Sequence, residues 1–252
     1  MRKTLRGTTT AYALLGPAPG SSYSAIFRAK GEPGGNLASL DAGDPGLYVG
    51  GGTINLTFAN EIGAAAAYFR QIHSDALSAA QAGTFLTQSF AAGQPVRFVA
   101  VRLPDAAAPA AALPAETAFL DIFAADAVPA GEAANYAMLY VVPPNGKLTA
   151  LYPTDADFLA AVTRTAFNAA ALLADYNAGL ASYDPALGLA PIPMLRTCLL
   201  SGGQFRPKSV AVDAVAKAIF AGFADAIART GAASGITLIE FESGGGEFAA
   251  IA

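Results

Sequence analysis

The stretch that decides the fold is residues 194–205, MLRTCLLSGGQF, with the helix-patterned run 210–229 behind it. Its apolar first half predicts a strand, and Ser201-Gly202-Gly203 predicts a tight turn before the helix. In α/β proteins, a strand followed by a glycine turn and a helix commonly forms a phosphate-binding site. Glycine lets the backbone approach the anion, and free N–H groups near the helix start stabilise its charge. The same order also forms ordinary βα turns. The turn therefore makes a nucleotide-type ligand a hypothesis and does not name an activity.

Hydrophobic spacing predicts the remaining elements. The expected strands are 12–15, 23–28, 47–58, 95–103, 136–142, 194–200 and 236–242. The expected helices are 63–82, 115–125, 154–178 and 210–229, and residues 34–45 are expected to form a loop. Thr154 and Asp157 have the spacing of a helix-capping pair, and Gly179 is expected to end that helix.

From residue 95 onward these elements follow the order β-α-β-α-β-α-β. Such alternation predicts an α/β fold, a three-layer α/β/α sandwich around a mixed, mostly parallel sheet. With 252 residues and 54% hydrophobic side chains, the chain can bury one large core. We expect a single domain over 1–252, with a β-rich or irregular part at 1–46 and the core at 47–242. Ligands of such sheets gather at the carboxyl ends of the strands, where the 201–203 turn should lie.

The composition excludes several classes of site. The net charge of −4 and the scattered basic residues argue against nucleic-acid binding. Each apolar run is interrupted before about 18 residues, so no membrane partner is expected, and the apolar stretch after Arg2, Lys3 and Arg6 is too short for a signal peptide, which favours a cytoplasmic location. A single cysteine, Cys198, and a single histidine exclude a disulfide within the chain and a cysteine or multi-histidine metal site. We expect no metal and no cofactor.

Two stretches resemble the macro domain family. In that family an apolar strand ends in Asn-Ala-Ala-Asn and is followed by a glycine-rich turn and a helix. Residues 54–72, INLTFANEIGAAAAYFRQI, resemble this first loop, with Asn60 at the end of the motif and Gly63 at the turn. The glycine triplet 50–52 precedes the asparagine here, whereas the family has its glycines after it.

The second stretch, residues 196–205, resembles the family's second phosphate loop, in which a strand ends in Ser/Thr-Gly and an aromatic residue follows. The matching positions are Ser201, Gly202, Gly203 and Phe205, with Gln204 between the last two. The family binds ADP-ribose and related nucleotides, and some members hydrolyse ADP-ribose linkages. The resemblance implies that backbone amides of this loop hold phosphate and that Phe205 flanks the distal ribose, to which Asn60 would donate or accept a hydrogen bond.

Several residues have a second interpretation. Asn60 is also a suitable cap for the following helix. Asp41 and Asp44 are typical of a solvated turn, although an acid in an early loop can accept from an adenine amino group. His73 is the single imidazole of the chain and is expected at the surface.

The chemistry of the turn is also open to more than one interpretation. Ser201 lacks the glycine two places before it that marks a nucleophile elbow, which argues against a serine hydrolase. Arg206 and Lys208 either neutralise a diphosphate or face water. The sequence leaves open whether the protein is an enzyme and what its oligomeric state is. Besides ADP-ribose binding, the sequence is compatible with a hydrolase or transferase acting on another phosphorylated metabolite and with a non-enzymatic interaction protein.

Overall fold

The computed structural model describes residues 2–15, 37–42, 96–102, 115–123, 137–197, 199–203 and 205–242. These residues form an eight-stranded sheet with the order β1-β2-β8-β7-β3-β6-β5-β4. The strands are β1 (Arg2–Thr4), β2 (Ala11–Leu15), β3 (Leu37–Ala42), β4 (Val96–Arg102), β5 (Ala118–Phe123), β6 (Ala137–Val141), β7 (Met194–Thr197) and β8 (Leu238–Glu242).

The sheet is parallel at its centre and antiparallel at its two edges. Strands β2, β8, β7, β3 and β6 run parallel to one another. Strand β1 is antiparallel to β2 at one edge, and β5 and β4 are antiparallel at the other. The predicted α/β class with a mixed, mostly parallel sheet is therefore confirmed.

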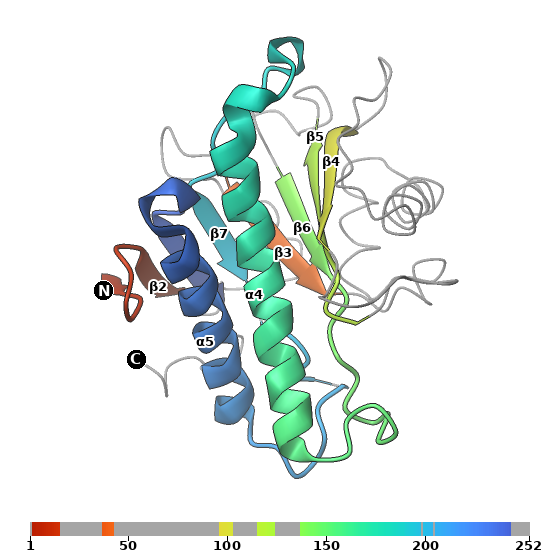
Figure 1. The fold of residues 1–252 in the computed structure, drawn as a ribbon. Coiled ribbons are helices and arrows are strands. Elements are labelled where there is room, and N and C mark those ends of the chain that lie inside the picture. The colour runs from red at the N-terminus through yellow and green to blue at the C-terminus, as the bar shows by residue number, and fades with distance from the viewer. Residues whose placement is uncertain are drawn as a thin grey trace.

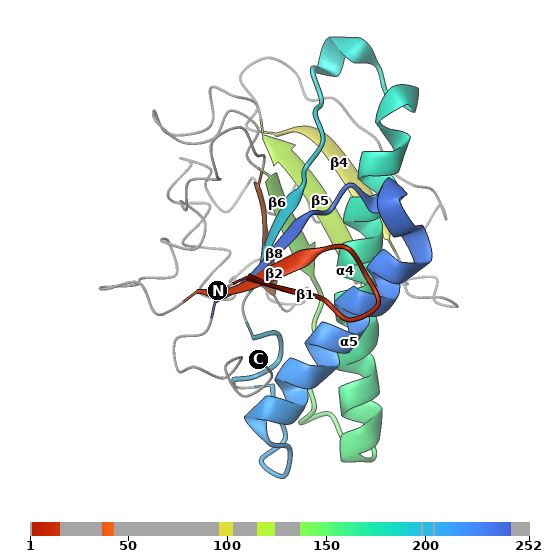
Figure 2. The ribbon, with the colours of Figure 1, turned by 90° about the vertical axis from the view of Figure 1, so that its left-hand side faces the viewer.

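Two long helices, α4 (Asp155–Gly179) and α5 (Val212–Thr230), lie side by side on the same face of the sheet (Figures 1 and 2). Helix α4 connects β6 to β7, and α5 connects β7 to β8. Short 3-10 turns follow them at Leu180–Ser182, Pro185–Leu187 and Gly231–Ser234. The second helical layer of the predicted sandwich, including the predicted helix 63–82, falls outside the described residues.

The start of α4 confirms the capping pair expected from the sequence. The Thr154 hydroxyl accepts from the Asp157 backbone N–H at 3.2 Å, and the Asp157 carboxylate accepts from the Thr154 N–H at 3.0 Å. This reciprocal arrangement satisfies two backbone donors at the helix start. Every residue from 169 to 174 of α4 is buried, because the helix packs against both the sheet and α5.

Small residues let the two helices approach closely. A Cβ at Gly222 of α5 would lie 2.2 Å from the Thr163 carbonyl oxygen and 2.8 Å from the Phe167 nitrogen, both on α4. A side chain at this position is therefore excluded by the backbone of the neighbouring helix. Helix α5 also packs on the sheet, where Phe220 stacks on Phe241 of β8 at 4.0 Å between ring centroids.

One predicted helix is wrong. Residues 115–125 were expected to be helical because Phe119, Ile122 and Phe123 have a helical spacing. The structure instead has strand β5 there, with Leu120 buried and paired in register with Leu139 of β6. A short apolar run is compatible with the periodicity of a helix and with that of a strand. Pairing with the strands on both sides of β5 makes this segment a strand. The chain order from β4 is consequently β-β-β-α-β-α-β.

One predicted loop is also wrong. Residues 34–45 contain β3, which pairs with β6 on one side and β7 on the other. The flanking glycines and prolines made the whole segment resemble a loop, while pairing on both edges holds a strand of weak intrinsic preference. The predicted strands 23–28 and 47–58 lie outside the described residues. No helix among the described residues is long and apolar enough to cross a membrane.

Candidate functional site

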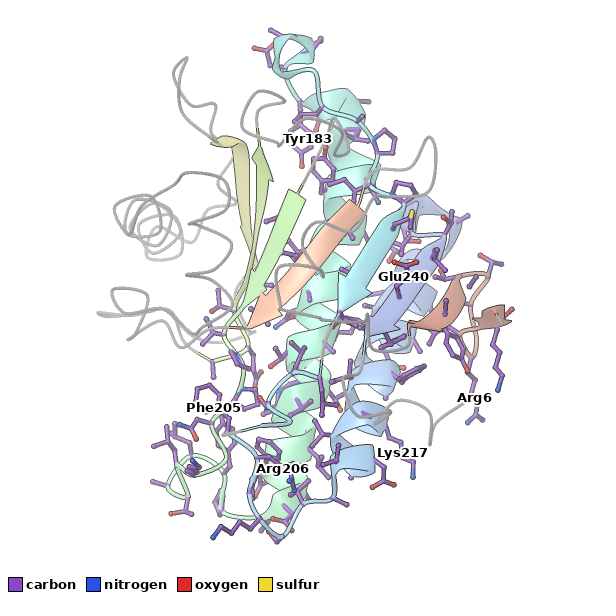
Figure 3. The ribbon with its side chains drawn as sticks, turned by 180° about the vertical axis from the view of Figure 1, so that it is seen from behind. Arg6, Tyr183, Phe205, Arg206, Lys217 and Glu240 are labelled. Carbon is purple, nitrogen blue, oxygen red and sulfur yellow. The ribbon has the colours of Figure 1, made fainter. Side chains whose placement is uncertain are left out.

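The candidate site is the segment between β7 and α5, here called the β7–α5 loop (residues 198–211, of which 199–203 and 205–211 are described). The predicted order of strand, glycine turn and helix is confirmed, although β7 ends at Thr197 instead of residue 200. Because β7 is parallel to β3 and β8, the loop leaves the sheet at their common carboxyl edge. Figure 3 shows Phe205 and Arg206 below the arrowheads of β3 and β7. This is the edge at which parallel sheets bind ligands.

Ser201 shapes the turn. Its φ of 54° is in the left-handed region, and the residue is 7% exposed. The Ser201 hydroxyl donates to the Pro144 carbonyl oxygen at 2.8 Å. A buried hydroxyl held in this way ties the loop to the neighbouring loop, and the observation agrees with the absence of a nucleophile-elbow pattern.

Some backbone N–H groups of the β7–α5 loop donate within the protein, and others do not. The Gly202 N–H donates to Leu199 O at 3.3 Å, and the Arg206 N–H donates to Gly203 O at 3.2 Å. Within the described part of the chain, the N–H groups of Ser201, Gly203 and Phe205 donate to no protein acceptor. Unpartnered backbone donors in a turn are one property that an anion site requires.

The two glycines of the turn have different surroundings. A Cβ at Gly202 would meet the Leu199 side chain at 2.0 Å, so this position faces the protein. A Cβ at Gly203 would meet nothing within 4 Å, and Gly203 is exposed. Gly203 therefore presents its backbone to solvent, where a ligand can approach it closely.

Arg206 holds the loop closed. Its Nε donates to Gly202 O at 3.1 Å, and its Nη1 donates to Val210 O. The side chain thus spans the loop from Gly202 in the turn to Val210 near the start of α5. Lys208, in contrast, is exposed. Of the two basic residues, Arg206 is built into the loop, and neither excludes a diphosphate.

The segment between β6 and α4, here called the β6–α4 loop (residues 142–154), packs against the β7–α5 loop. The Gly146 N–H donates to Phe205 O at 2.8 Å, in addition to the Ser201–Pro144 bond. A Cβ on Gly146 would lie 2.5 Å from Cδ of Pro207, so the two loops touch at this point. The Ser209 hydroxyl adds a 2.7 Å bond to Asp155 at the start of α4.

The structure gives a position to only part of the predicted site. Ser201, Gly202, Gly203 and Phe205 come together in the β7–α5 loop. The remaining predicted site residues, Asn60, Gly63 and Gln204, and the single histidine, His73, lie outside the described residues.

Strand β3, which was not expected from the sequence, brings another segment to this edge. It lies between β7 and β6 and ends with Asp41 and Ala42, so its carboxyl end shares the edge with the β7–α5 loop. Asp41 pairs in register with Tyr140 of β6. The sequence signal that could have indicated this segment is Asp41-Ala42-Gly43-Asp44, followed by the glycine triplet 50–52.

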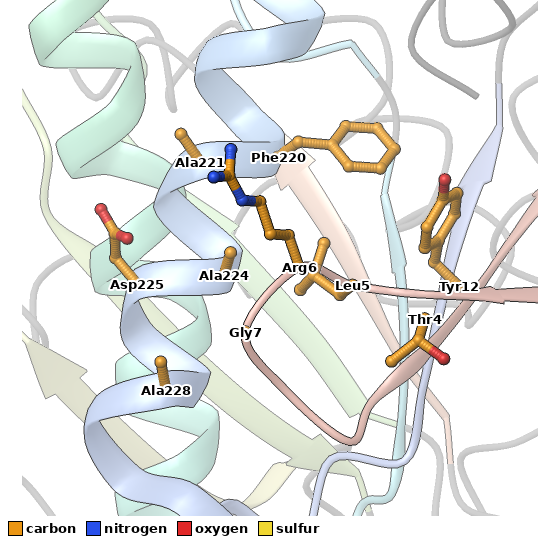
Figure 4. A pocket seen from close by; sticks show the side chains of 10 residues that line it. All are labelled: Thr4, Leu5, Arg6, Gly7, Tyr12, Phe220, Ala221, Ala224, Asp225 and Ala228. Atoms are coloured by element: carbon orange, nitrogen blue, oxygen red, sulfur yellow. The ribbon is translucent and has the colours of Figure 1, made fainter.

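A separate cavity of about 720 Å³ lies between the β1–β2 hairpin and the outer face of α5 (Figure 4). Arg6 extends over a floor of alanines that includes Ala224, and Tyr12 and Phe220 form the inner wall. The cavity contains no predicted site residue.

Among the described residues, no group of three His, Cys, Asp or Glu side chains is placed to hold a metal ion.

Comparison with known proteins identifies the fold. Three solved structures of the Oceanobacillus iheyensis macrodomain resemble this chain. A glycine-to-valine mutant with ADPR has a TM-score of 0.54 at 8% identity, covering 99% of this chain and 92% of the macrodomain. The form with MES bound has a TM-score of 0.52 at 9% identity, with 100% and 92% covered. An aspartate-to-alanine mutant has a TM-score of 0.51 at 9% identity, with 96% and 87% covered.

Comparison of the sequence found no match: no family model and no curated protein matches the chain. Identities of 8–9% support a statement about the fold alone. The similarity covers nearly the whole chain, and the parallel centre of the sheet carries the β7–α5 loop at its carboxyl edge. The chain therefore has a divergent, macrodomain-like fold.

Proposed function

We propose that this protein binds ADP-ribose or a closely related nucleotide at the carboxyl edge of its sheet. The observation that carries the proposal is the β7–α5 loop, in which the N–H groups of Ser201, Gly203 and Phe205 have no acceptor within the described part of the chain. A diphosphate supplies several anionic oxygens to such donors. The macrodomain-like fold, shared with a solved macrodomain structure that holds ADPR, supports this ligand class.

Binding follows from backbone chemistry. Gly203 is exposed and a Cβ there would meet nothing within 4 Å, so we expect a phosphate oxygen to reach its N–H at normal hydrogen-bonding distance. Phe205, which is half-buried, is proposed to flank the distal ribose with its ring.

Two segments are candidates for the family's Asn-Ala-Ala-Asn motif. The first is the stretch that ends at Asn60, with Gly63 at the turn. The second is Asp41-Ala42-Gly43-Asp44, which begins at the end of central strand β3 and is followed by the glycine triplet 50–52. We favour the second, because β3 ends at the same edge as the β7–α5 loop and the glycines then follow the motif. An acid would replace each asparagine of the motif, so ribose hydroxyls would donate to a carboxylate.

Isothermal titration calorimetry with ADP-ribose, ADP, AMP and inorganic phosphate tests the proposal. A ligand at 100 times its Kd stabilises a protein by about 2.7 kcal/mol, so a thermal-shift screen on the same panel gives an independent readout. We expect ADP-ribose to bind more tightly than AMP, which lacks the second phosphate and the distal ribose. Absence of binding to every nucleotide would refute the proposal and favour an interaction protein instead.

A matched variant separates the proposed site from the hairpin cavity. Ala224→Leu places a larger apolar side chain in the cavity floor, far along α5 from the β7–α5 loop. We expect unchanged ADP-ribose affinity in this variant, and a large loss of affinity would place the ligand in the cavity. Incubation of the bound ligand, followed by product analysis, then shows whether binding is accompanied by hydrolysis or transfer.

A further inference from the structure

We propose that Glu116 is a positioning residue for the β7–α5 loop. Together with Arg164 and Asn168 of α4 it forms what is here called the Glu116 clamp, which fixes the β6–α4 loop and, through it, the backbone donors of the candidate site. The inference rests on the proposed function for its ligand, and its geometry stands independently of that ligand.

Glu116 has an unusual backbone conformation. Its φ of 73° lies in the left-handed region, which a residue with a Cβ rarely adopts. The surrounding contacts must therefore hold it there, and such residues gather at ligand sites and switch regions more often than elsewhere.

Three side-chain contacts hold Glu116 in place. The Arg164 guanidinium donates from Nε to Oε2 at 2.8 Å and from Nη2 to Oε1 at 2.7 Å, a bidentate pair. The Asn168 amide donates to the Glu116 carbonyl oxygen at 2.8 Å. The Glu116 side chain is 12% exposed, whereas Arg164 is 56% exposed, so the carboxylate is the enclosed partner.

The backbone of Glu116 leads directly to the site. Its N–H donates to Val142 O at 2.8 Å, and the Val142 N–H donates to Thr117 O at 2.9 Å. Pro143 and Pro144 follow, each with a restricted φ, so the chain is stiff over this step. Pro144 O then accepts from the Ser201 hydroxyl at 2.8 Å.

A second connection runs through the same loop. The Gly146 N–H donates to Phe205 O at 2.8 Å, so the β6–α4 loop holds the β7–α5 loop on both sides of Gly203. Ser201 and Phe205 are two of the residues whose N–H groups are unpartnered in the described chain. Loss of the Glu116 clamp should therefore loosen the donors that the proposed ligand needs.

Glu116→Gln tests the proposal, because it keeps the size of the side chain and removes its charge. The control is Asp175→Asn, which neutralises another carboxylate facing an arginine, Arg229 at 3.8 Å, away from the candidate site. One readout is ADP-ribose affinity, measured well below the Tm of every variant. The other is amide hydrogen exchange in residues 199–206 without ligand, which a purely local role of Glu116 would not change.

For Glu116→Gln we expect faster exchange in residues 199–206 and an ADP-ribose affinity lower by about three- to fivefold, the scale set by a partly exposed ion pair. Asp175→Asn should change neither quantity. Unchanged exchange in Glu116→Gln would overturn the proposal. If the wild type binds no ADP-ribose but exchange still rises in Glu116→Gln, the positioning role stands and the proposed function fails.

Glu116→Gly gives a second test if the glutamine variant is unstable. Glycine adopts a positive φ without strain, so this variant should keep a Tm close to that of the wild type while losing the bond to Arg164. A nearly unchanged Tm with faster exchange in residues 199–206 would support the proposal. A nearly unchanged Tm with unchanged exchange would overturn it.

Discussion

Gly203→Asp is the most direct test of an anion site in the β7–α5 loop. A Cβ at Gly203 meets nothing within 4 Å, and the residue is exposed, so the new side chain fits without displacing the protein. We expect the free energy of unfolding to change by no more than about 0.5 kcal/mol, as for other exposed substitutions. The new carboxylate would lie in the same turn as Ser201 and Phe205, whose N–H groups are unpartnered in the described chain.

The expected loss of affinity follows from Coulomb's law. A phosphate bound to the Gly203 N–H would lie about 5 Å from the Asp carboxylate, given normal hydrogen-bond lengths. Two unit charges at that distance repel by about 3 kcal/mol at an effective dielectric constant of about 20 and by about 1 kcal/mol in bulk water. ADP-ribose should therefore bind roughly 5- to 150-fold more weakly.

Calorimetry on Gly203→Asp and on the uncharged, equally large Gly203→Asn separates charge from size. The asparagine variant should bind ADP-ribose nearly as well as the wild type, and the deficit of the aspartate variant should shrink in high salt because ions screen the repulsion. Equal losses in both variants would show a steric effect. Wild-type affinity in Gly203→Asp would refute phosphate binding by this loop.

Substitutions at three further positions test the fold and the loop. Gly222→Ala should lower the free energy of unfolding by about 1–3 kcal/mol, measured by urea denaturation, because its Cβ meets the Thr163 carbonyl at 2.2 Å; an unchanged midpoint would contradict the close helix contact. Ser201→Ala should cost about 1 kcal/mol through the lost bond to Pro144, while Ser201→Gly should be less destabilising because glycine tolerates φ of 54°. Burial raises the pKa of Tyr152, so the folded protein holds this proton longer than the unfolded chain, and stability should fall as pH rises above about 10. Tyr152→Phe should reduce that fall in denaturation experiments, and an identical pH profile would contradict the effect of the half-buried phenol.

The sequence predicted the elements whose signals are local. Thr154 and Asp157 form the expected capping box, and the helix that follows ends at Gly179 as expected. The order of β7, turn and α5 was also predictable, because a glycine turn and a long amphipathic run leave few other arrangements. Ser201 and Gly203 could therefore be selected from sequence, whereas the unpartnered state of their N–H groups required the structure.

The missed elements depend on distant partners. Strand β3 has few β-favouring residues and is stabilised by pairing with β6 and β7, which are far away in the sequence. Strand β5 has a helix-like spacing and becomes a strand because β4 and β6 pair with both of its edges. The Glu116 clamp could not be predicted from the sequence either, since Arg164 lies 48 residues further along the chain.

If the proposed site binds through its backbone, this chemistry would account for a fold that is recognisable at very low sequence identity. Binding through backbone N–H groups constrains side chains only where they would block the ligand or where they shape the turn, as at Gly203 and Ser201. Most other positions need only preserve packing, which many apolar residues can do. A site of this kind constrains the identity of few residues, which is consistent with a macrodomain-like structure at 8–9% identity and no matching family model. The donors, and not the side chains around them, are therefore the feature by which this site should be tested.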